Sequence, residues 1–494
     1  MSKVCLCLTG KTLATDLEVL NKYRKWVDIA ELRVDYLNMD ERLQIRRFPE
    51  LAGIPTILTV RRKSDGGRFI EGEGARIVLL ASGLAFADTE KRRNFAYVDL
   101  EEDLDVPSLE EAARTFGTRI IRSFHDFTGV PSDLSRRIRS LVRNGDEIAK
   151  VAVMARGLGD VAKVFHSCDA TRDIEKIVLA MGPYGVCTRI LAEKAGSVLS
   201  YTSPRGEHDF DCAGPGQLDP VELVETYRFR SLNTNSRIFG IIGSPLEATS
   251  SPAIHNPAFT RCDLDAVYLP FKTDTLSGFF ELAGELKIQG VSVTIPYKES
   301  IVPYLGDRSD QVIKIGSCNT AVKKGSVWHG YNTDAEGFSS SLLKAMDRTH
   351  LKRKRIGIIG AGGVACAVAA EVHRLGGHAC ILNRNEARAK ALAEKYKFAW
   401  GALDGRGIEL LDHFNEIIIQ TTSVGMEPDV DADPIELYRF RGREIVMDLI
   451  YKPAKTRMLQ RASAAGCRIL NGRDMLERQA HLQFKLFTDK DFPI

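Results

Sequence analysis

One lysine, Lys150, lies inside the otherwise apolar segment Ile148–Met154, where its amine could act as a nucleophile. Burial away from water disfavours the charged ammonium, so an amine held there can attack a carbonyl carbon and form a Schiff base. His125 lies in the segment Ser-Phe-His-Asp-Phe, and its imidazole suits proton transfer from the carbon next to an imine. Taken alone, a strand lysine that extends to solvent is the simpler interpretation of Lys150. The two residues together favour Schiff-base chemistry.

A second lysine, Lys298, follows an apolar segment and a proline in Gly-Val-Ser-Val-Thr-Ile-Pro-Tyr-Lys. Downstream, Gly-Tyr-Asn-Thr-Asp ends at Asp334. Read separately, these are a surface lysine and a helix-capping segment. Brought together, the carboxylate would orient the ammonium, and the pair could move a proton to or from a substrate oxygen.

A glycine-rich turn after the apolar segment Ile356–Ile359 indicates a nucleotide site. Glycines let the backbone approach a pyrophosphate, whose charge the following helix N-terminus would meet. The next predicted strand, His378–Asn383, is followed by Arg384 and Arg388 rather than by the carboxylate that binds an NAD ribose. Two arginines would attract a 2′-phosphate, so the sequence predicts NADP rather than NAD. The turn consists of Gly360, Ala361, Gly362, Gly363, Val364 and Ala365.

The elements that must position the first lysine form a regular alternation over about 228 residues. Eight short apolar runs alternate with helical patterns, which predicts a closed parallel (β/α)8 barrel. A doubly wound open sheet is the alternative. The runs are Val4–Leu8, Val27–Arg33, Ile54–Val60, Tyr97–Leu100, Arg119–Phe124, Ile148–Met154, Lys176–Met181 and Ser197–Tyr201. Active sites of such barrels lie at the C-terminal strand ends, which here carry Glu31, Arg33, Arg61, Asp99, Glu101, His125, Asp126 and Lys150, with Arg189 beyond the seventh run.

After a polar linker the alternation restarts with a different pattern. We expect strands at Ile238–Ile242, Ala266–Leu269 and Val291–Ile295, a hairpin over Thr320–Trp328, and then a Rossmann unit. The predicted domains are a barrel over 1–228, a linker over 229–236, a substrate-binding domain over 237–340 completed by a helix at about 475–494, and a Rossmann domain over 341–474.

Composition limits the class of protein. The chain has 494 residues, 44% hydrophobic and 27% charged, with a net charge of +3. That balance argues against nucleic-acid binding, and the sequence shows no membrane span and no secretory signal. The ten cysteines form no CxxC motif and no Cys/His cluster. We therefore expect reduced thiols, no metal site and a cytoplasmic enzyme.

The ordered motifs of the first part resemble type I 3-dehydroquinate dehydratase. They are Glu31-Leu-Arg-Val-Asp35, the Arg61 loop ending Asp65-Gly-Gly67, the His125 and Lys150 segments, Met181-Gly-Pro-Tyr-Gly-Val-Cys-Thr-Arg189 and Gly214-Pro-Gly-Gln217. The resemblance implies Lys150 as the Schiff-base residue, His125 as the general acid/base and Arg189 as the ligand of the substrate carboxylate. It implies substrate positioning by Glu31, Arg33, Arg61 and Gln217. The chain departs from the pattern at Asp65, where a glutamate usually orients the histidine, and at Ala213 and Cys7, where serines are usual.

The second part resembles shikimate dehydrogenase over roughly 238–494. Further motifs carry the resemblance: Ser317-Cys-Asn-Thr320, Thr421-Thr-Ser-Val-Gly-Met426, Asp448-Leu-Ile-Tyr-Lys-Pro453 and Met475-Leu-Glu-Arg-Gln-Ala480. It implies Thr249 and Ser251 at the substrate carboxylate, and Thr294, Lys298, Asn319, Asp334, Tyr451 and Gln479 around the substrate. Asn383, Arg384 and Arg388 would hold the adenosine phosphate, and Thr422, Ser423 and Met426 would lie along the coenzyme. Ser292, where asparagine is frequent, leaves the choice between shikimate and quinate open.

The two resemblances together imply a bifunctional shikimate-pathway enzyme. It would convert 3-dehydroquinate to 3-dehydroshikimate through a Lys150 imine, and then reduce that product to shikimate with NADPH. Two alternatives stay open: a quinate/shikimate dehydrogenase using NAD(P) fused to the dehydratase, or a metabolite sensor without turnover. The sequence leaves the oligomeric state undetermined.

Overall fold

The computed structural model describes residues 1–84, 90, 93–207, 210–246 and 249–493. The chain forms two compact units, the first comprising Met1–Ile238 with Asp263–Lys287 and the second comprising Phe239–Cys262 with Ile288–Ile494. In the described ranges, no helix combines the length and the hydrophobicity that crossing a membrane requires. The domain boundaries given above stay a prediction.

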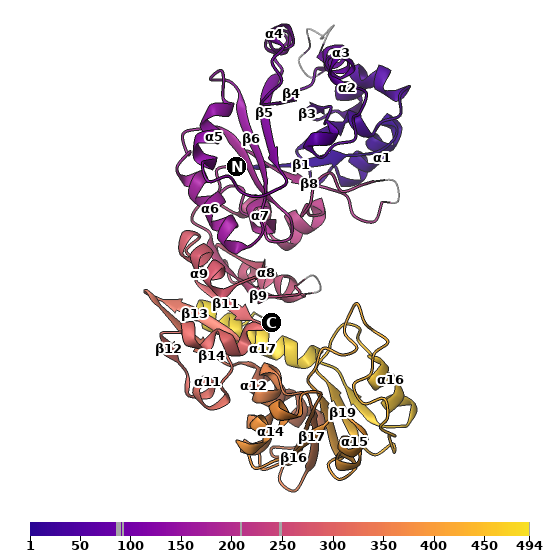
Figure 1. Ribbon diagram of the computed structural model, residues 1–494, viewed down its shortest axis with the longest axis vertical. Helices are drawn as coiled ribbons and strands as arrows, with labels where there is room; N and C mark the ends of the chain where they lie inside the picture. Colours follow the sequence, from indigo (N-terminus) through magenta and orange to yellow (C-terminus); the bar gives the residue numbers. More distant parts are fainter. Residues whose placement is uncertain (85–89, 91–92, 208–209, 247–248, 494) are drawn as a thin grey trace. The chain divides into compact units, whose positions relative to one another are not determined.

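The first unit contains a parallel eight-stranded sheet in the order β7-β6-β5-β4-β3-β2-β1-β8 (Figure 1). A bridge between Lys176 and Ser197 joins β7 to the residues before β8, so the sheet is nearly closed. Neighbouring strands follow chain order, which excludes the doubly wound alternative and confirms the predicted barrel. The strands are β1 (Lys3–Leu8), β2 (Ile29–Arg33), β3 (Thr56–Thr59), β4 (Tyr97–Glu101), β5 (Arg119–Asp126), β6 (Ile148–Met154), β7 (Lys176–Met181) and β8 (Leu199–Thr202).

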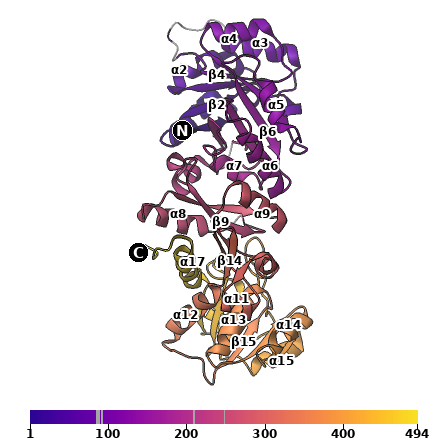
Figure 2. The same ribbon diagram turned by 90° about the vertical axis from the view of Figure 1, so that its left-hand side faces the viewer.

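Helices surround these strands (Figures 1 and 2). Their apolar faces cover the outside of the barrel, as in α5, where Leu134, Ile138 and Leu141 are buried. The helices are α1 (Leu13–Tyr23), α2 (Phe48–Ala52), α3 (Glu73–Leu84), α4 (Pro107–Thr115), α5 (Leu134–Leu141), α6 (Leu158–Asp169) and α7 (Val186–Ile190). Short turns of helix cover Val34–Tyr36, Glu41–Arg47, Lys63–Asp65, Glu222–Thr226 and Phe229–Ser231.

The barrel interior is apolar below and polar near its C-terminal rim. The buried apolar cluster consists of Cys5, Cys7, Ile29, Ile57, Ile121, Ile148, Ile177, Leu179, Leu199 and Tyr201. Branched side chains dominate this layer because they fill the narrow space between strands. The charged residues at the C-terminal strand ends therefore lie next to this closely packed apolar cluster.

A second, six-stranded sheet has the order β10-β9-β11-β13-β14-β12. The predicted hairpin is present, with β13 and β14 antiparallel, and it extends three residues further, to Tyr331. The strands are β9 (Arg237–Gly243), β10 (Ala266–Lys272), β11 (Gly290–Val293), β12 (Asp307–Arg308), β13 (Thr320–Lys324) and β14 (Val327–Tyr331). The helices are α8 (Ser251–Arg261), α9 (Leu276–Glu285), α10 (Tyr297–Ser300), α11 (Asp310–Ile315), α12 (Asp334–Met346) and α17 (Arg473–Thr488), with a short turn at Val302–Tyr304.

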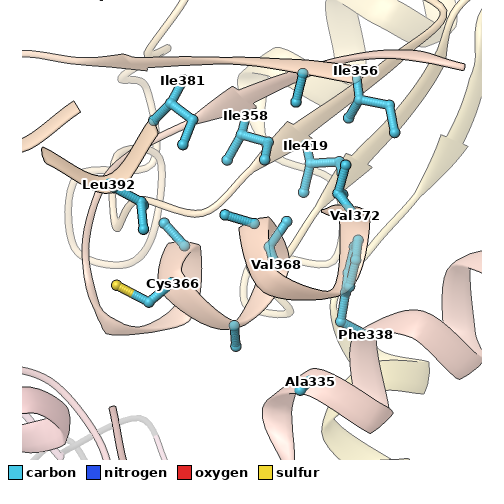
Figure 3. Close-up of a cluster of buried hydrophobic side chains, with 14 of the residues drawn as sticks. Ala335, Phe338, Ile356, Ile358, Cys366, Val368, Val372, Ile381, Leu392 and Ile419 are labelled. Atoms are coloured by element: carbon cyan, nitrogen blue, oxygen red, sulfur yellow. The ribbon is translucent and has the colours of Figure 1, made fainter. Parts of the chain in front are cut away.

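The third sheet is parallel and has the order β17-β16-β15-β18-β19-β20, which is the predicted Rossmann arrangement. Val368 and Val372 of α13 pack on Ile358 and Ile419 of the sheet (Figure 3). The strands are β15 (Arg355–Ile359), β16 (His378–Asn383), β17 (Ala399–Ala402), β18 (Ile417–Gln420), β19 (Ile445–Asp448) and β20 (Arg468–Leu470). The helices are α13 (Gly363–Arg374), α14 (Glu386–Glu394), α15 (Gly405–Asp412) and α16 (Arg457–Ala464).

Candidate active sites

Lys150 lies in a polar layer at the barrel rim that is built from the even-numbered strands. Its Nζ donates to Asp99 Oδ2 at 2.7 Å and lies 3.7 Å from Glu31 Oε1. The same atom lies 4.3 Å from the centroid of the Tyr201 ring. Glu31, Asp99, Lys150 and Tyr201 come from β2, β4, β6 and β8 respectively. Alternate strands supply one layer of a (β/α)8 interior, so the fold itself brings these four residues together.

Side chains of the odd-numbered strands hold the two carboxylates of this layer. Thr59 Oγ1 donates to Glu31 Oε1 at 2.9 Å, and the Cys7 thiol donates to Glu31 Oε2 at 3.1 Å. Ser123 Oγ donates to Asp99 Oδ1 at 2.6 Å. Burial alone would raise the pKa of Asp99, but the nearby guanidinium of Arg61 and the Lys150 ammonium outweigh it and hold the pKa well below its usual range. Asp99 is therefore a fixed anion against the lysine.

His125 lines the same pocket as Lys150 and is a neutral imidazole at physiological pH. Burial lowers its pKa well below the usual value, and the positive charge of Arg61 lowers it further. Asp65, which departs from the family pattern, forms no hydrogen bond with His125 among the described contacts. The Asp65 carboxylate instead accepts from Arg62 Nε at 2.7 Å, and no described group bonds to His125 Nδ1. Asp65 is one methylene shorter than glutamate, and its partner Arg62 lies on the same loop.

Two of the three arginines at the rim are neutralised by carboxylates. Arg33 forms a two-point contact with Asp35, at 2.9 Å and 2.8 Å. Arg61 bonds Asp99 at 2.7 Å and Glu101 at 2.6 Å. A guanidinium already engaged in this way has little capacity left for a substrate anion. These two residues line the pocket and form ion pairs with the carboxylates of Asp35, Asp99 and Glu101.

Arg189 differs because its guanidinium is buried without a carboxylate among the described residues. Its contacts are the backbone oxygens of Tyr201, at 3.4 Å, and Pro215, at 3.1 Å, and its Nε has no partner there. Burial lowers its pKa to about 10, in contrast to the two paired arginines. Next to it, Gln217 Nε2 approaches Cys7 Sγ at 3.4 Å. Arg189 is therefore the guanidinium of this pocket that is prepared to receive an anion.

All seven predicted barrel residues line one pocket, together with several residues that were not predicted as site residues. Asp99 was recognised only as a strand-end charge, although counting alternate strands of the barrel would have placed it beside Lys150. The additional lining residues are Asp65, Gly66, Phe127, Ala152, Leu179, Met181, Tyr201, Ala213 and Gly214. Apolar members of such a set carry no sequence signal that separates them from ordinary core residues.

In the second unit, Lys298 and Asp334 form the predicted pair. Lys298 Nζ donates to Asp334 Oδ2 at 2.5 Å, and both side chains are buried. Lys298 lies on the short helix α10, and Asp334 is the first residue of α12. The Cys318 amide donates to the Lys298 backbone oxygen at 2.7 Å, which fixes α10 against the neighbouring loop. The ammonium is thus held in one place by a carboxylate from a separate element.

An amide network surrounds this pair. Asn319 Nδ2 donates to Thr333 Oγ1 at 2.9 Å and to Gln479 Oε1 at 3.1 Å. One turn further along α17, Gln483 accepts from Ser292 Oγ at 2.8 Å. Gln483 was not predicted, although its spacing of four residues from Gln479 places both on one helix face. Ser292 is therefore tied to α17.

A neighbouring pocket collects four of the other predicted substrate and coenzyme residues. Thr249, Thr294, Met426 and Tyr451 line it together. Ser251 is buried at the start of α8 and lies 3.4 Å from the Thr249 hydroxyl without lining the pocket itself. Burial raises the pKa of Tyr451, so its phenol is a neutral hydrogen-bond donor. Hydroxyl groups of this kind can bind an anion without a formal positive charge.

The glycine-rich turn leads from β15 into α13 as predicted. Gly360 has a φ of +115°, which strongly favours glycine, and a Cβ at Gly363 would lie 2.8 Å from the Lys298 Cβ. A Cβ at Gly362 would meet no atom within 4 Å, and no side chain caps the start of α13. Open space before uncapped helical N–H groups fits a pyrophosphate.

The residues predicted from the sequence to bind a 2′-phosphate lie at the end of β16 and in the segment that follows it. Arg384 and Arg388 are exposed, and Asn383 Nδ2 donates to the backbone oxygen of Asn385 at 3.0 Å. Arg388 pairs with Glu299 of the α10 helix at 3.2 Å. Thr422 Oγ1 accepts from the Val424 amide, and the Met426 amide donates to the Ser423 oxygen, in the loop after β18. These contacts form the loop, and its Thr422 side chain lies against the glycine-rich turn, where a Cβ at Gly360 would meet Thr422 Cγ2 at 2.9 Å.

No group of three or more metal-ligating side chains occurs in the part of the chain that the structure describes.

Comparison with known protein families covers both halves. Residues 4–234 match the model for type I 3-dehydroquinase. Residues 241–321 match the substrate-binding domain of shikimate dehydrogenase, and residues 342–432 match shikimate / quinate 5-dehydrogenase.

Individual relatives show the same division. A bifunctional 3-dehydroquinate dehydratase/shikimate dehydrogenase of Arabidopsis thaliana, described as chloroplastic, is 28% identical over 97% of this chain and 80% of its own length. An NADP(+) shikimate dehydrogenase of Caldanaerobacter subterraneus is 35% identical over 53% of this chain and 96% of its own length. A solved shikimate dehydrogenase from Aquifex aeolicus is 32% identical, with a TM-score of 0.49, and covers 53% of this chain and 96% of its own. The chain therefore belongs to the shikimate dehydrogenase family and joins the fold of that family to a type I 3-dehydroquinase domain.

Proposed function

We propose that this protein is a bifunctional enzyme that dehydrates 3-dehydroquinate to 3-dehydroshikimate and reduces that product to shikimate with NADPH. The observation that carries the first activity is the buried Lys150 amine, which faces a pocket that also holds the neutral His125 and the unpaired Arg189. A nucleophile, a base and an anion receptor are the three groups that dehydration through an imine needs.

In the barrel, Arg189 binds the substrate carboxylate and thereby places the ketone carbon against Lys150. The amine attacks that carbon, and loss of water gives an iminium ion. His125, which is neutral, then accepts a proton from the adjacent carbon, and the same group returns it to the departing hydroxyl, which leaves as water. A water molecule then adds to the iminium carbon, and cleavage of its bond to the Lys150 nitrogen releases 3-dehydroshikimate and the free amine. Glu31, Arg33, Arg61 and Gln217 fix the ring and its hydroxyls.

In the second unit, Thr249 and Ser251 bind the carboxylate of the substrate, with Tyr451 beside them. Thr294, Asn319 and Gln479 orient the ring hydroxyls. When bound, NADPH supplies the two reducing electrons. Lys298, held by Asp334, donates a proton to the oxygen that develops negative charge during reduction. Gly360 to Ala365 receive the pyrophosphate, Asn383, Arg384 and Arg388 receive the 2′-phosphate, and Thr422, Ser423 and Met426 line the rest of the coenzyme.

Two experiments test this assignment. Borohydride reduction in the presence of 3-dehydroquinate, followed by peptide mass analysis, is expected to leave one adduct, on Lys150. An adduct elsewhere, or none, would overturn the imine mechanism. For the second unit, oxidation of shikimate and of quinate is measured with NADP and with NAD. We expect shikimate with NADP to be preferred, and a preference for quinate would make Ser292 the residue to examine.

We also propose a cytoplasmic location. The ten cysteines are all free thiols and eight are buried, which fits a reducing compartment. Fractionation of cells of the source organism followed by immunodetection tests this proposal.

A further inference from the structure

Three buried polar groups at the barrel pocket lack hydrogen-bond partners among the described residues. They are His125 Nδ1, Arg189 Nε and the phenol oxygen of Tyr201. Buried polar groups are nearly always paired, because an unpaired group loses the hydrogen bonds it would make with water. When several such groups surround one cavity, the simplest account is that the ligand completes them. His125 and Arg189 already have roles in the proposed dehydration, whereas Tyr201 has none.

Tyr201 is held firmly against the reacting groups. It lies on β8 and is 2% exposed. Its ring faces Lys150 Nζ at 4.3 Å from the centroid, within the range of a cation–π contact. Its backbone oxygen accepts from Arg189 Nη1 at 3.4 Å. The residue thus touches both the amine that would attack the substrate and the guanidinium that would bind its carboxylate.

The phenol is a neutral donor. Burial raises its pKa well above the usual value, and the neighbouring carboxylate of Glu31 raises it further. A neutral hydroxyl can donate one hydrogen bond, and an oxygen-rich substrate offers acceptors. Cys5 and Leu199 belong to the same buried cluster as Tyr201, and no described group bonds to the phenol oxygen.

The loop residue Ala213 strengthens the case. The resemblance described above places a serine there, so this chain has lost one hydroxyl from the loop before Gln217. Ala213 packs against the same cluster that contains Tyr201. Tyr201 and Ala213 both line the pocket, and of the two only Tyr201 carries a hydroxyl.

We propose that Tyr201 is a substrate-binding residue of the dehydratase site, whose hydroxyl forms its hydrogen bond only when the substrate is bound. This inference rests on the proposed dehydratase activity. It adds a substrate contact that none of the predicted roles includes. It also gives Tyr201 a binding role in addition to its packing in the buried apolar cluster of the barrel.

The test is Tyr201→Phe in the full-length protein, which removes one oxygen and keeps the ring. We expect the KM for 3-dehydroquinate to rise roughly three- to tenfold, the scale of one neutral hydrogen bond. The unfolding midpoint of the ligand-free barrel is expected to stay unchanged or rise, because the oxygen has no partner to lose. A lower midpoint with an unchanged KM would show a structural role and overturn the proposal, as would no change in either quantity.

Tyr438→Phe is the matched control, because the Tyr438 hydroxyl donates to Glu444 Oε1 at 3.1 Å in the second unit. This variant is expected to lower the stability of the second unit and to leave the dehydratase KM unchanged.

Borohydride trapping on the wild-type protein distinguishes failure of the proposed dehydratase function from failure of the inference about Tyr201. If the wild-type forms no Lys150 adduct, the proposed function fails. If it forms the adduct and Tyr201→Phe binds substrate normally, only the inference about Tyr201 fails.

Discussion

Two arginines of the barrel pocket, Arg189 and Arg33, are expected to respond in opposite ways to the same substitution. Arg189 is buried without a carboxylate among the described residues, and burial lowers its pKa to about 10, well below the usual value for arginine. This lowering means that burial disfavours the charged guanidinium by roughly 3 kcal/mol, since a tenfold change in an ionisation equilibrium corresponds to about 1.4 kcal/mol. Replacing Arg189 with Met removes this cost while it retains an apolar side chain of similar length.

We therefore expect Arg189→Met to leave the barrel as stable as before, or more stable by up to about 3 kcal/mol. The same change removes the proposed receptor for the substrate carboxylate. Losing one partner of a buried charge pair costs about 2–5 kcal/mol, which is roughly 30-fold to several thousandfold in kcat/KM for the dehydratase. A large catalytic loss without a loss of stability would show that Arg189 contributes to ligand binding and not to the stability of the ligand-free fold.

Arg33→Met is the matched comparison. Arg33 is equally buried but forms two bonds with Asp35, so its removal leaves the buried Asp35 carboxylate without its positive charge and with only the backbone amides of Arg61 and Arg68 as donors among the described residues. We expect the barrel to be destabilised by about 3–5 kcal/mol.

Hydrogen exchange read on peptides of β2, β6 and β8 measures the stability of the barrel separately from the second unit. Initial rates of enone formation give kcat/KM. If Arg189→Met destabilises the barrel as much as Arg33→Met does, the guanidinium has a structural partner and the reasoning fails.

Three further predictions concern charge. Arg388→Ala is expected to raise the KM for NADPH at least tenfold more than the KM for NADH. Glu299→Gln frees Arg388 from its ion pair, so this variant is expected to lower the KM for NADPH. Equal effects on both coenzymes would argue against a 2′-phosphate site. Burial raises the pKa of Asp16 to about 7, so its ionisation costs stability as the pH rises from about 4 to 7. Asp16→Asn is expected to stabilise the barrel at pH 8, by at most about 4 kcal/mol, and progressively less as the pH falls toward 4 in denaturant titrations. The lowered pKa of His125 keeps the imidazole neutral, so dehydratase kcat/KM is expected to stay level down to pH 6.5 and fall only below it; a decline that begins above pH 7 would contradict this.

Much of the fold follows from local patterns in the sequence. Two of the eight predicted barrel strands, Ile148–Met154 and Lys176–Met181, have the predicted bounds. The strand at Val27–Arg33 begins two residues later than predicted, at Ile29, and the strand at Arg119–Phe124 continues to Asp126. Strand ends depend on where the partner strand stops, and that information is not local.

The site could be predicted where chemistry leaves a distinctive residue. Lysine in an apolar strand is unusual, so Lys150 could be found, and the arginines and histidine at strand ends followed from the barrel. The hydrogen bonds could not be predicted. Whether Asp65 bonds His125 or Arg62 depends on about one methylene of reach, and whether an arginine is paired depends on a second residue whose side-chain orientation the sequence does not specify.

The polar layer around Lys150 explains why a charged residue is tolerated inside the barrel. The ammonium is opposed by Asp99 and, at longer range, by Glu31, and its remaining side faces the Tyr201 ring. An iminium ion on the same nitrogen carries the same positive charge as the ammonium. The layer therefore suits both the resting lysine and the intermediate, and it is least suited to the neutral amine that connects them. In the proposed mechanism the carboxylates would stabilise the iminium once it forms, and the neutral imidazole of His125 would take the proton that the attacking ammonium loses and return it to the carbinolamine hydroxyl that leaves as water, which makes His125 neutral again for the next step.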